Sequence, residues 1–274
     1  MGVSFDNDEA GACFSFSGDP DTCDVNFTIP TIPDALYDAG YISSRSYSLY
    51  LDDIEEQKGS ILFGGIDTAK FTGDLITLAT QVDLSGDAHN GNYVRQDVRL
   101  TSISGTVNGT FTQLSESNYS ATVTIDSGTA GFDLPDPFYS AIVDGLPIVQ
   151  DDQGNNVIPC KYAAWDAFLT TEFSGADGTS VSIDIPLAQF IVTDWEQSEG
   201  GYNSTTQANV DGEEVCLFTL DYTEETDGML LGDPLFRSAY IVVSTLRRPG
   251  IHRFTSPKTE TDHFHVDQDT IVAL

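Results

Sequence analysis

Apolar and polar residues alternate with a period of two along several short stretches of this 274-residue chain. Successive side chains of a β-strand point to opposite faces of a sheet, so this alternation is typical of half-buried strands. The first three stretches place apolar side chains at Tyr47, Leu49 and Leu51, at Ile61 and Phe63, and at Leu75, Ile76 and Leu78. Further strands are predicted at residues 97–103, 121–125, 181–185, 189–192 and 214–220. Many short strands with few helices predict an all-β fold.

The few helices that the sequence predicts are short and are bounded by residues that favour helix ends. Residues 34–39 form the first, and Gly40 follows its last turn. Asp136 is the predicted N-cap of the second, which has Pro137 at its first helical position and runs to about residue 143. The helices therefore connect strands and do not form a layer of their own.

The strand at residues 121–125 leads into a tight polar turn, D-S-G-T, that begins at Asp126. Gly128 lets the backbone curl without a Cβ clash, and Ser127 and Thr129 place hydroxyl donors beside the carboxylate. Such donors stabilise the ionised carboxylate. The turn is therefore a candidate catalytic site, although strings of this kind also form ordinary polar turns.

The chain is strongly acidic, with 43 Asp and Glu against 11 Lys and Arg and a formal net charge of −32. An anionic surface of this size repels nucleic acid and anionic lipid, so neither is an expected partner. No apolar run reaches membrane-spanning length. Protonation at low pH would relieve the self-repulsion, which suits an acidic environment; a role of the charge in solubility explains it equally well.

The cysteines and sequons fit an oxidising compartment. Four cysteines, Cys13, Cys23, Cys160 and Cys216, allow three disulfide pairings. No C-x-x-C or metal-spaced histidine accompanies them, and His252, His263 and His265 have no spacing that defines a metal site, so neither a metal nor a cofactor is predicted. Glycosylation sequons, which fit secretion, begin at Asn26, Asn108, Asn118 and Asn203. The first residues lack the basic and apolar regions of a signal peptide.

Several stretches, in this order, resemble the pepsin-like aspartic proteases, and most closely their fungal yapsin-like and candidapepsin-like branch. They are Y-S-L-Y-L at residues 47–51, S-I-L-F-G-G-I-D at 60–67, F-T-G-D-L at 71–75, the Asp126 turn, and L-L-G-D-P-L-F-R-S-A-Y at 230–240. The resemblance covers about residues 30–243 and implies the bilobal acid-protease fold. It matches the second lobe of such an enzyme.

The resemblance also implies a division of the chain. Residues 1–45 are expected to be a remnant of the first lobe, residues 46–243 the second lobe, and residues 244–274 a tail that departs from the family's last strands. The first lobe's catalytic aspartate would be absent. A disulfide-ready chain without an export signal is then expected to be part of a longer precursor whose full-length form is extracellular or at the cell surface.

The chemistry that the resemblance implies is hydrolysis of a peptide bond by a water molecule held between two aspartates. Asp126 would be one of them, Thr129 would bond its outer oxygen, and Ser127 would reach across the lobe interface. The strand Leu230-Leu231-Gly232 would pass beneath the turn, with Asp233 capping a short helix after it. A disulfide between Cys160 and Cys216 is likewise implied, which leaves Cys13 and Cys23 as a pair.

Two features of the sequence depart from an active enzyme of this family. Ala130, Gly131 and Asp133 replace the residues that the family usually places in the substrate-facing wall. No second D-[ST]-G-[ST] occurs in the chain, and one carboxylate cannot act as both base and acid in a single turnover. The expectation is an aspartic endopeptidase for protein or peptide substrates that requires the missing first lobe and is inactive alone.

Three other interpretations stay open at this point. A homodimer would supply a second carboxylate, although residues 1–50 would occupy part of the first lobe's space. A non-enzymatic secreted or cell-wall binding module could use half of a protease fold. A calcium- or glycan-binding β-sandwich unrelated to proteases is the third, and Asp126 on the floor of a pocket would exclude it.

Overall fold

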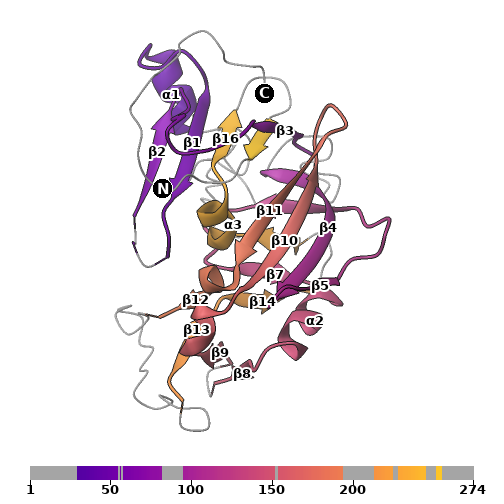
Figure 1. Ribbon diagram of the computed structural model, residues 1–274. Coiled ribbons are helices and arrows are strands. Elements are labelled where there is room, and N and C mark those ends of the chain that lie inside the picture. The colour runs from indigo at the N-terminus through magenta and orange to yellow at the C-terminus, as the bar shows by residue number, and fades with distance from the viewer. Residues whose placement is uncertain are drawn as a thin grey trace, which may run out of the picture.

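A computed structural model describes residues 30–54, 56, 58–81, 95–151, 154–193, 213–224 and 228–244, and the backbone of 251–254. Strands predominate in these residues, and the helices between them are short (Figure 1). The prediction of an all-β fold is therefore confirmed.

The first sheet is antiparallel and has five strands in the order β2-β1-β16-β17-β3. They are β2 Gly59–Phe63, β1 Ser46–Leu51, β16 Ile241–Ser244, β17 Ile251–Phe254 and β3 Ile76–Ala79. β17 lies within the predicted tail and pairs with both β16 and β3. Part of that tail therefore contributes to the sheet.

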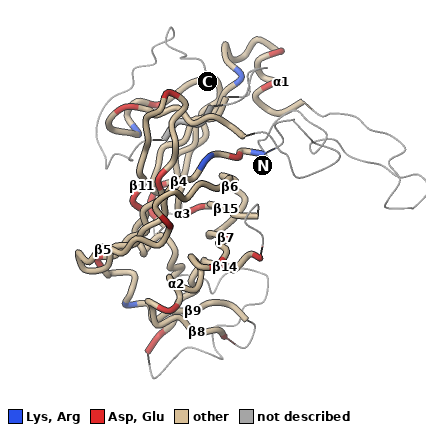
Figure 2. The backbone as a smooth tube through the Cα atoms, turned by 90° about the vertical axis from the view of Figure 1, so that its right-hand side faces the viewer, with Lys and Arg blue, Asp and Glu red and all other residues tan. Residues whose placement is uncertain are grey.

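The second sheet carries the Asp126 turn and follows the strand order β11-β10-β4-β6-β15-β7-β14, with β5 paired to β4. The strands are β11 Ser180–Pro186, β10 Ala167–Ser174, β4 Asp97–Val107, β6 Ala121–Ile125, β15 Leu230–Leu231, β7 Phe132–Leu134, β14 Leu220–Tyr222 and β5 Thr110–Gln113. β15 pairs in parallel with β6, and β14 pairs in parallel with β7. Figure 2 shows β6, β15, β7 and β14 following one another through the middle of the molecule.

A third sheet, β12-β13-β9-β8, lies at one end of the chain's fold (Figure 1). Its strands are β12 Ile191–Val192, β13 Val215–Phe218, β9 Asn156–Pro159 and β8 Val149–Gln150. The implied Cys160–Cys216 disulfide is present and joins β13 to the turn after β9. Closing a loop of 56 residues contributes about 4 kcal/mol in the chain-entropy account. Cys13 and Cys23 lie outside the described residues.

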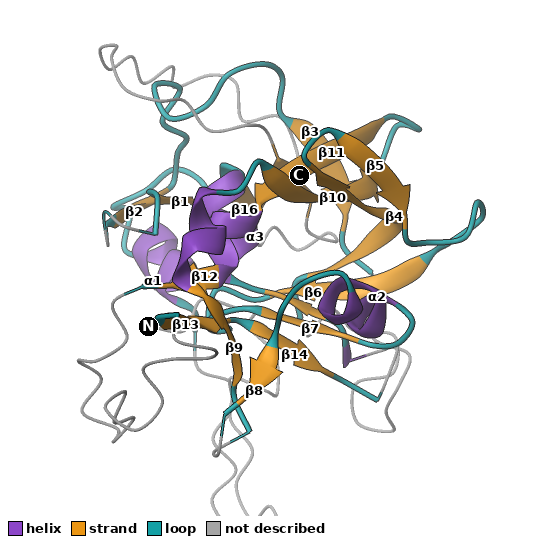
Figure 3. Cartoon of the chain, turned by 60° about the horizontal axis from the view of Figure 1, so that its bottom comes forward, coloured by secondary structure: helices purple, strands orange, loops and turns teal. Residues whose placement is uncertain are grey.

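One hydrophobic core joins the sheets. Fully buried side chains from the strands around the Asp126 turn, such as Phe132 and Leu231, pack in the same cluster as Ile241 of the five-stranded sheet. Helix α3 (Asp233–Ser238) contacts β1 and β11, and α2 (Phe138–Asp144) lies against β14 (Figure 3). The core therefore fixes β15 and the start of α3 beneath the turn.

The predicted helix boundaries need correction. α1 spans Ile32–Asp38 and begins at the Thr31 cap, whose side chain accepts a bond from the Asp34 amide, while Gly40 takes its expected left-handed conformation with φ +75°. Pro137, and not Asp136, occupies the N-cap position of α2, and the peptide bond between them is cis. The Asp136 carboxylate still accepts a bond from the Ser140 amide. It therefore satisfies an amide of the first helical turn although it lies before the N-cap.

Three other boundaries also differ from the prediction. Gly232, and not Asp233, is the N-cap of α3. The first two residues of the predicted strand at 189–192 belong to a 3-10 helix, Leu187–Phe190, and its last two form β12. The predicted strand at 214–220 divides at Thr219 into β13 and β14. The predicted loop between residues 103 and 121 contains β5. Another 3-10 helix, Cys160–Ala164, follows β9.

Candidate active site

The Asp126 turn leaves the end of β6 and closes on its own carboxylate. The Gly128 amide donates to Asp126 Oδ1 at 2.8 Å, and Thr129 Oγ1 donates to Oδ2 at 2.7 Å. The Thr129 amide also donates to the Asp126 carbonyl at 3.2 Å. Each carboxylate oxygen thus accepts a bond within four residues, and the Thr129 contact is the one that the resemblance implies.

β15 holds the turn from below. Its residues Leu230 and Leu231 lie opposite Thr124 and Ile125 of β6. The Asp126 amide donates to the Leu231 carbonyl at 3.1 Å. The backbone of Asp126 is therefore anchored to a strand more than a hundred residues away in sequence, at the position that the resemblance implies for Leu230-Leu231-Gly232.

Two glycines permit the close packing around the turn. A Cβ at Gly232 would lie 2.0 Å from the Thr129 carbonyl oxygen, and one at Gly131 would lie 2.0 Å from the Thr219 carbonyl oxygen. The two segments are also bonded, because the Gly232 amide donates to the Gly131 carbonyl at 2.9 Å and the Asp233 amide donates to the Thr129 carbonyl at 2.9 Å. No larger residue fits at either position without moving the backbone.

Ser127 borders a cleft of about 470 Å³. The side chain is exposed, whereas Asp126 itself is half-buried. The cleft is bordered by β1, the start of β2 and α3, through Leu49, Leu51, Lys58, Gly59, Asp233, Phe236 and Arg237. The turn thus presents one face to the protein core and the other to an open space.

Further carboxylates surround the turn. Asp133 and Asp221 lie directly opposite one another on the parallel strands β7 and β14. Burial, the charge of Asp221 and the charge of Asp126 all raise the pKa of Asp133, and burial raises the pKa of Asp221. Burial also raises the pKa of Asp233, an effect that Arg237 opposes and Asp126 reinforces. These three neighbouring carboxyl groups therefore keep their protons to a higher pH than an ordinary Asp.

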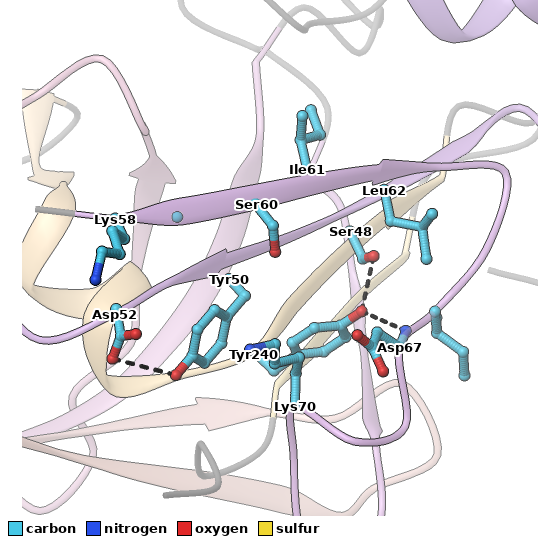
Figure 4. Close-up of a pocket in the computed structure, with 12 residues that line it drawn as sticks. Ser48, Tyr50, Asp52, Lys58, Ser60, Ile61, Leu62, Asp67, Lys70 and Tyr240 are labelled. Atoms are coloured by element: carbon cyan, nitrogen blue, oxygen red, sulfur yellow. Dashed lines mark hydrogen bonds between the residues drawn. The ribbon is translucent and has the colours of Figure 1, made fainter. Parts of the chain in front are cut away.

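A second hollow, of about 450 Å³, lies on the five-stranded sheet (Figure 4). At its floor the Asp67 amide donates to the Tyr240 hydroxyl oxygen at 2.7 Å, and that hydroxyl donates to Ser48 Oγ at 2.8 Å. The ammonium group of Lys70 lies 4.4 Å from the centre of the Tyr50 ring. The residues that line this hollow include none from the Asp126 turn.

The remaining predicted site residues lie apart from this turn. Asn108 and Asn118 are exposed in the loops flanking β5, while Asn26 and Asn203 lie outside the described residues. Within the described part of the chain, no group of three or more His, Cys, Asp or Glu is placed to hold a metal ion. None of the helices described there combines the length and apolarity needed to cross a bilayer.

Sequence reasoning placed Asp133 in the wall of the site but did not join it to Asp221 or Asp233. These residues are separated by 88 and 100 positions in the sequence, and only the sheet order brings them to one site. The L-L-G-D string did contain a signal for Asp233. Its first three residues were expected to pass beneath the turn, and Asp233 follows them directly.

Comparison with known proteins identifies similar sequences. Residues 1–248 match the eukaryotic aspartyl protease family. A probable aspartic-type endopeptidase, opsB, of Aspergillus fumigatus is 31% identical over 78% of this chain and 40% of its own length. Aspartic proteinase 3 of Saccharomyces cerevisiae is 30% identical over 77% of the chain and 32% of its own, and secreted aspartic protease 9 of Candida albicans is 28% identical over 81% and 36%. The chain thus spans about two fifths of the length of the Aspergillus relative.

Proposed function

Because this chain belongs to the eukaryotic aspartyl protease family, we propose that it supplies one of the two catalytic carboxylates of an aspartic-type endopeptidase. The observation that carries this proposal is the Asp126 turn, whose two carboxylate oxygens are held by Gly128 and Thr129 beside an open cleft. Protein or peptide chains are the proposed substrates.

The proposed reaction uses Asp126 with a second carboxylate across the cleft. One of the two is ionised and takes a proton from a bound water, and the other is protonated and donates to the carbonyl oxygen of the scissile bond. Two such carboxyls cannot both ionise, so the pair titrates in two macroscopic steps. The bonds from Gly128 and Thr129 support its part because they keep the carboxylate in one orientation.

The second carboxylate is proposed to come from a complementary first lobe. The sequence holds a single D-[ST]-G-[ST] turn. In that turn, Ser127 is exposed and borders the cleft, where a loop of a partner lobe would reach it. The chain is accordingly proposed to be inactive without that lobe.

The full-length protein is proposed to work outside the cell or at its surface. The Cys160–Cys216 disulfide supports an oxidising compartment, and one relative bears the name secreted aspartic protease.

A complementation assay tests the proposed role of Asp126. The chain is co-expressed with the first lobe of the Aspergillus fumigatus relative, the complex is isolated by size exclusion, and peptide hydrolysis is measured between about pH 3 and 5. We expect turnover that falls by about 10²–10⁴-fold in Asp126→Asn. The exposed Asp144→Asn serves as the matched control and should leave turnover unchanged. An isolated complex whose turnover is absent, or survives Asp126→Asn, would contradict the proposal.

A further inference from the structure

The hairpin of β4 and β5 ends in a turn that is also a glycosylation sequon. Val107 pairs with Thr110, which leaves Asn108 and Gly109 as a two-residue turn with φ of +49° and +75°. Asn-Gly favours such turns because both residues tolerate positive φ. Asn108, Gly109 and Thr110 are all exposed, so the complete sequon is accessible.

Exposed apolar side chains lie on both faces of the hairpin near this turn. Phe111 is 62% exposed on the strand that follows it, and Val107 is 37% exposed on the strand that precedes it. Trp165, 36% exposed, is the neighbour of Asp166, whose carbonyl accepts a bond from the Asn108 amide at 2.8 Å. Because Phe111 pairs with Thr106, its ring and Val107 lie on opposite faces of the hairpin. The Phe111 ring is the large exposed apolar side chain directly after the sequon, and a group attached at the turn would cover it.

The strand β5 adds an exposed edge at the same place. It pairs only with β4 among the described strands, and all four of its residues are exposed. An exposed edge strand carrying an aromatic side chain is a template for pairing with other chains, and proteins usually block such edges. A bulky hydrophilic group at the start of β5 would block this one.

We propose that Asn108 carries an N-linked glycan whose first sugars cover the ring of Phe111 and shield the edge of β5. The donor is an oligosaccharide linked to a lipid diphosphate. The bond from its anomeric carbon to the diphosphate oxygen breaks, a bond from that carbon to Asn108 Nδ2 forms, the amide loses one proton, and the lipid diphosphate leaves. The disulfide between Cys160 and Cys216 supports passage through the oxidising compartment where this transfer occurs.

The position of the hairpin makes the modification compatible with an open active site. Asp97 at the other end of β4 pairs with Thr124, two residues before Asp126. The eleven residues of β4 extend for about 30 Å, and Figure 2 shows β5 at the outer margin of the molecule. The glycan would therefore stand clear of the cleft beside Ser127.

Asn118 provides an internal comparison. Its sequon continues with Tyr119, which is partly buried edge-on to Phe138, and with Ser120, whose hydroxyl accepts a bond from Arg99. These contacts tie the Asn118 loop to the protein body, whereas the Asn108 turn stands among exposed residues. Asn118→Gln is thus the control for removing a sequon without uncovering Phe111.

The experiment has two measurements on the full chain secreted from a yeast host. Mass spectrometry of glycopeptides should find Asn108 occupied, lost in Thr110→Val and retained in Thr110→Ser. The temperature of aggregation, followed by light scattering, should fall by about 2–4 °C in Thr110→Val relative to Thr110→Ser. This difference should vanish when Phe111→Ser is added, and Asn118→Gln should not reproduce it.

Two results would overturn the proposal. An unoccupied Asn108 in the secreted chain refutes the modification itself. Occupancy with an equal temperature difference in the presence and absence of Phe111→Ser refutes the covering of the ring. Neither result depends on peptidase activity.

Discussion

The Tyr240 hydroxyl on the five-stranded sheet and the Asp126 carboxylate on the eight-stranded sheet differ in the hydrogen bonds and charges that surround them. On the five-stranded sheet, the Tyr240 hydroxyl is bonded to both Asp67 and Ser48 within the chain, and the tyrosine is only 1% exposed. On the eight-stranded sheet, Asp126 is bonded by its own turn but lies among carboxyl groups that repel it, Asp133 and Asp233. The Tyr240 hydroxyl therefore has its hydrogen bonds satisfied within the chain, whereas the Asp126 carboxylate lies beside groups of like charge.

This difference separates a structural polar group from a functional one. A buried polar group that serves only the fold is stable when its bonds are satisfied internally. Carboxylates gathered with raised pKa values oppose folding, and proteins retain such clusters mainly at functional sites. The hollow on the five-stranded sheet is therefore part of the framework, and the open side of the Asp126 turn is where chemistry is expected.

The largest effect is expected where the turn meets β15. Gly232→Ala would place a Cβ 2.0 Å from the Thr129 carbonyl oxygen, so the backbone must move, and we expect a loss of about 3 kcal/mol or more in the free energy of unfolding. Gly105→Ala is the matched control, since nothing lies within 4 Å of its Cβ. Urea denaturation measures both. Equal values for the two variants would show that the turn is loosely packed.

An intermediate effect is expected at the hydroxyl of Tyr240. Tyr240→Phe leaves the Asp67 amide and Ser48 without their bonded partner in a buried position, which should cost about 1–3 kcal/mol. Tyr41→Phe, at a tyrosine that is 80% exposed, should change stability by less than about 0.5 kcal/mol. A Tyr240→Phe protein as stable as the control would mean that this network contributes nothing to the framework.

The smallest effect concerns the acidic pair and depends on pH. Because burial raises the pKa of Asp133 and of Asp221 in the folded protein, their contribution to stability is fully present below the ordinary Asp pKa of about 3.9 and is lost as the pH rises through the folded values. Combining Asp133→Asn with Asp221→Asn should therefore stabilise the chain at pH 7 by about 0.5 kcal/mol. The gain should disappear near pH 3.

Denaturation curves from pH 3 to 7 check this prediction, with Asp144→Asn as the exposed control. A gain that stays constant across this range would show that the effect is not electrostatic. A loss of stability at pH 7 would mean that the two carboxylates bind partners that compensate their charge.

Much of this site was predictable from local sequence. The alternation of Val123 and Ile125 fixed the strand, and the D-S-G-T turn identified Asp126, Thr129 and their mutual bond. Turn chemistry acts within four residues, so the sequence alone contains it. The order of the Leu230-Leu231-Gly232 string relative to the turn then indicated the strand beneath.

Other features depend on contacts between distant segments. Asp133 and Asp221 become neighbours only because β7 and β14 pair in parallel. β10 was not predicted, since its inward positions include Ala167 and Thr171, which weaken the apolar alternation. The start of α2 was misplaced by one residue, because Asp136 and Pro137 both favour the first positions of a helix and propensity alone does not separate the N-cap from the residue before it.

The most direct test of the half-site is peptide hydrolysis by the purified chain alone, compared with Asp126→Asn at about pH 4. If the chain holds one carboxylate of a two-carboxylate site, both proteins should show the same background rate at every protein concentration. Hydrolysis by the chain that is lost in Asp126→Asn would contradict this account, because a complete catalytic pair would then exist without a complementary lobe.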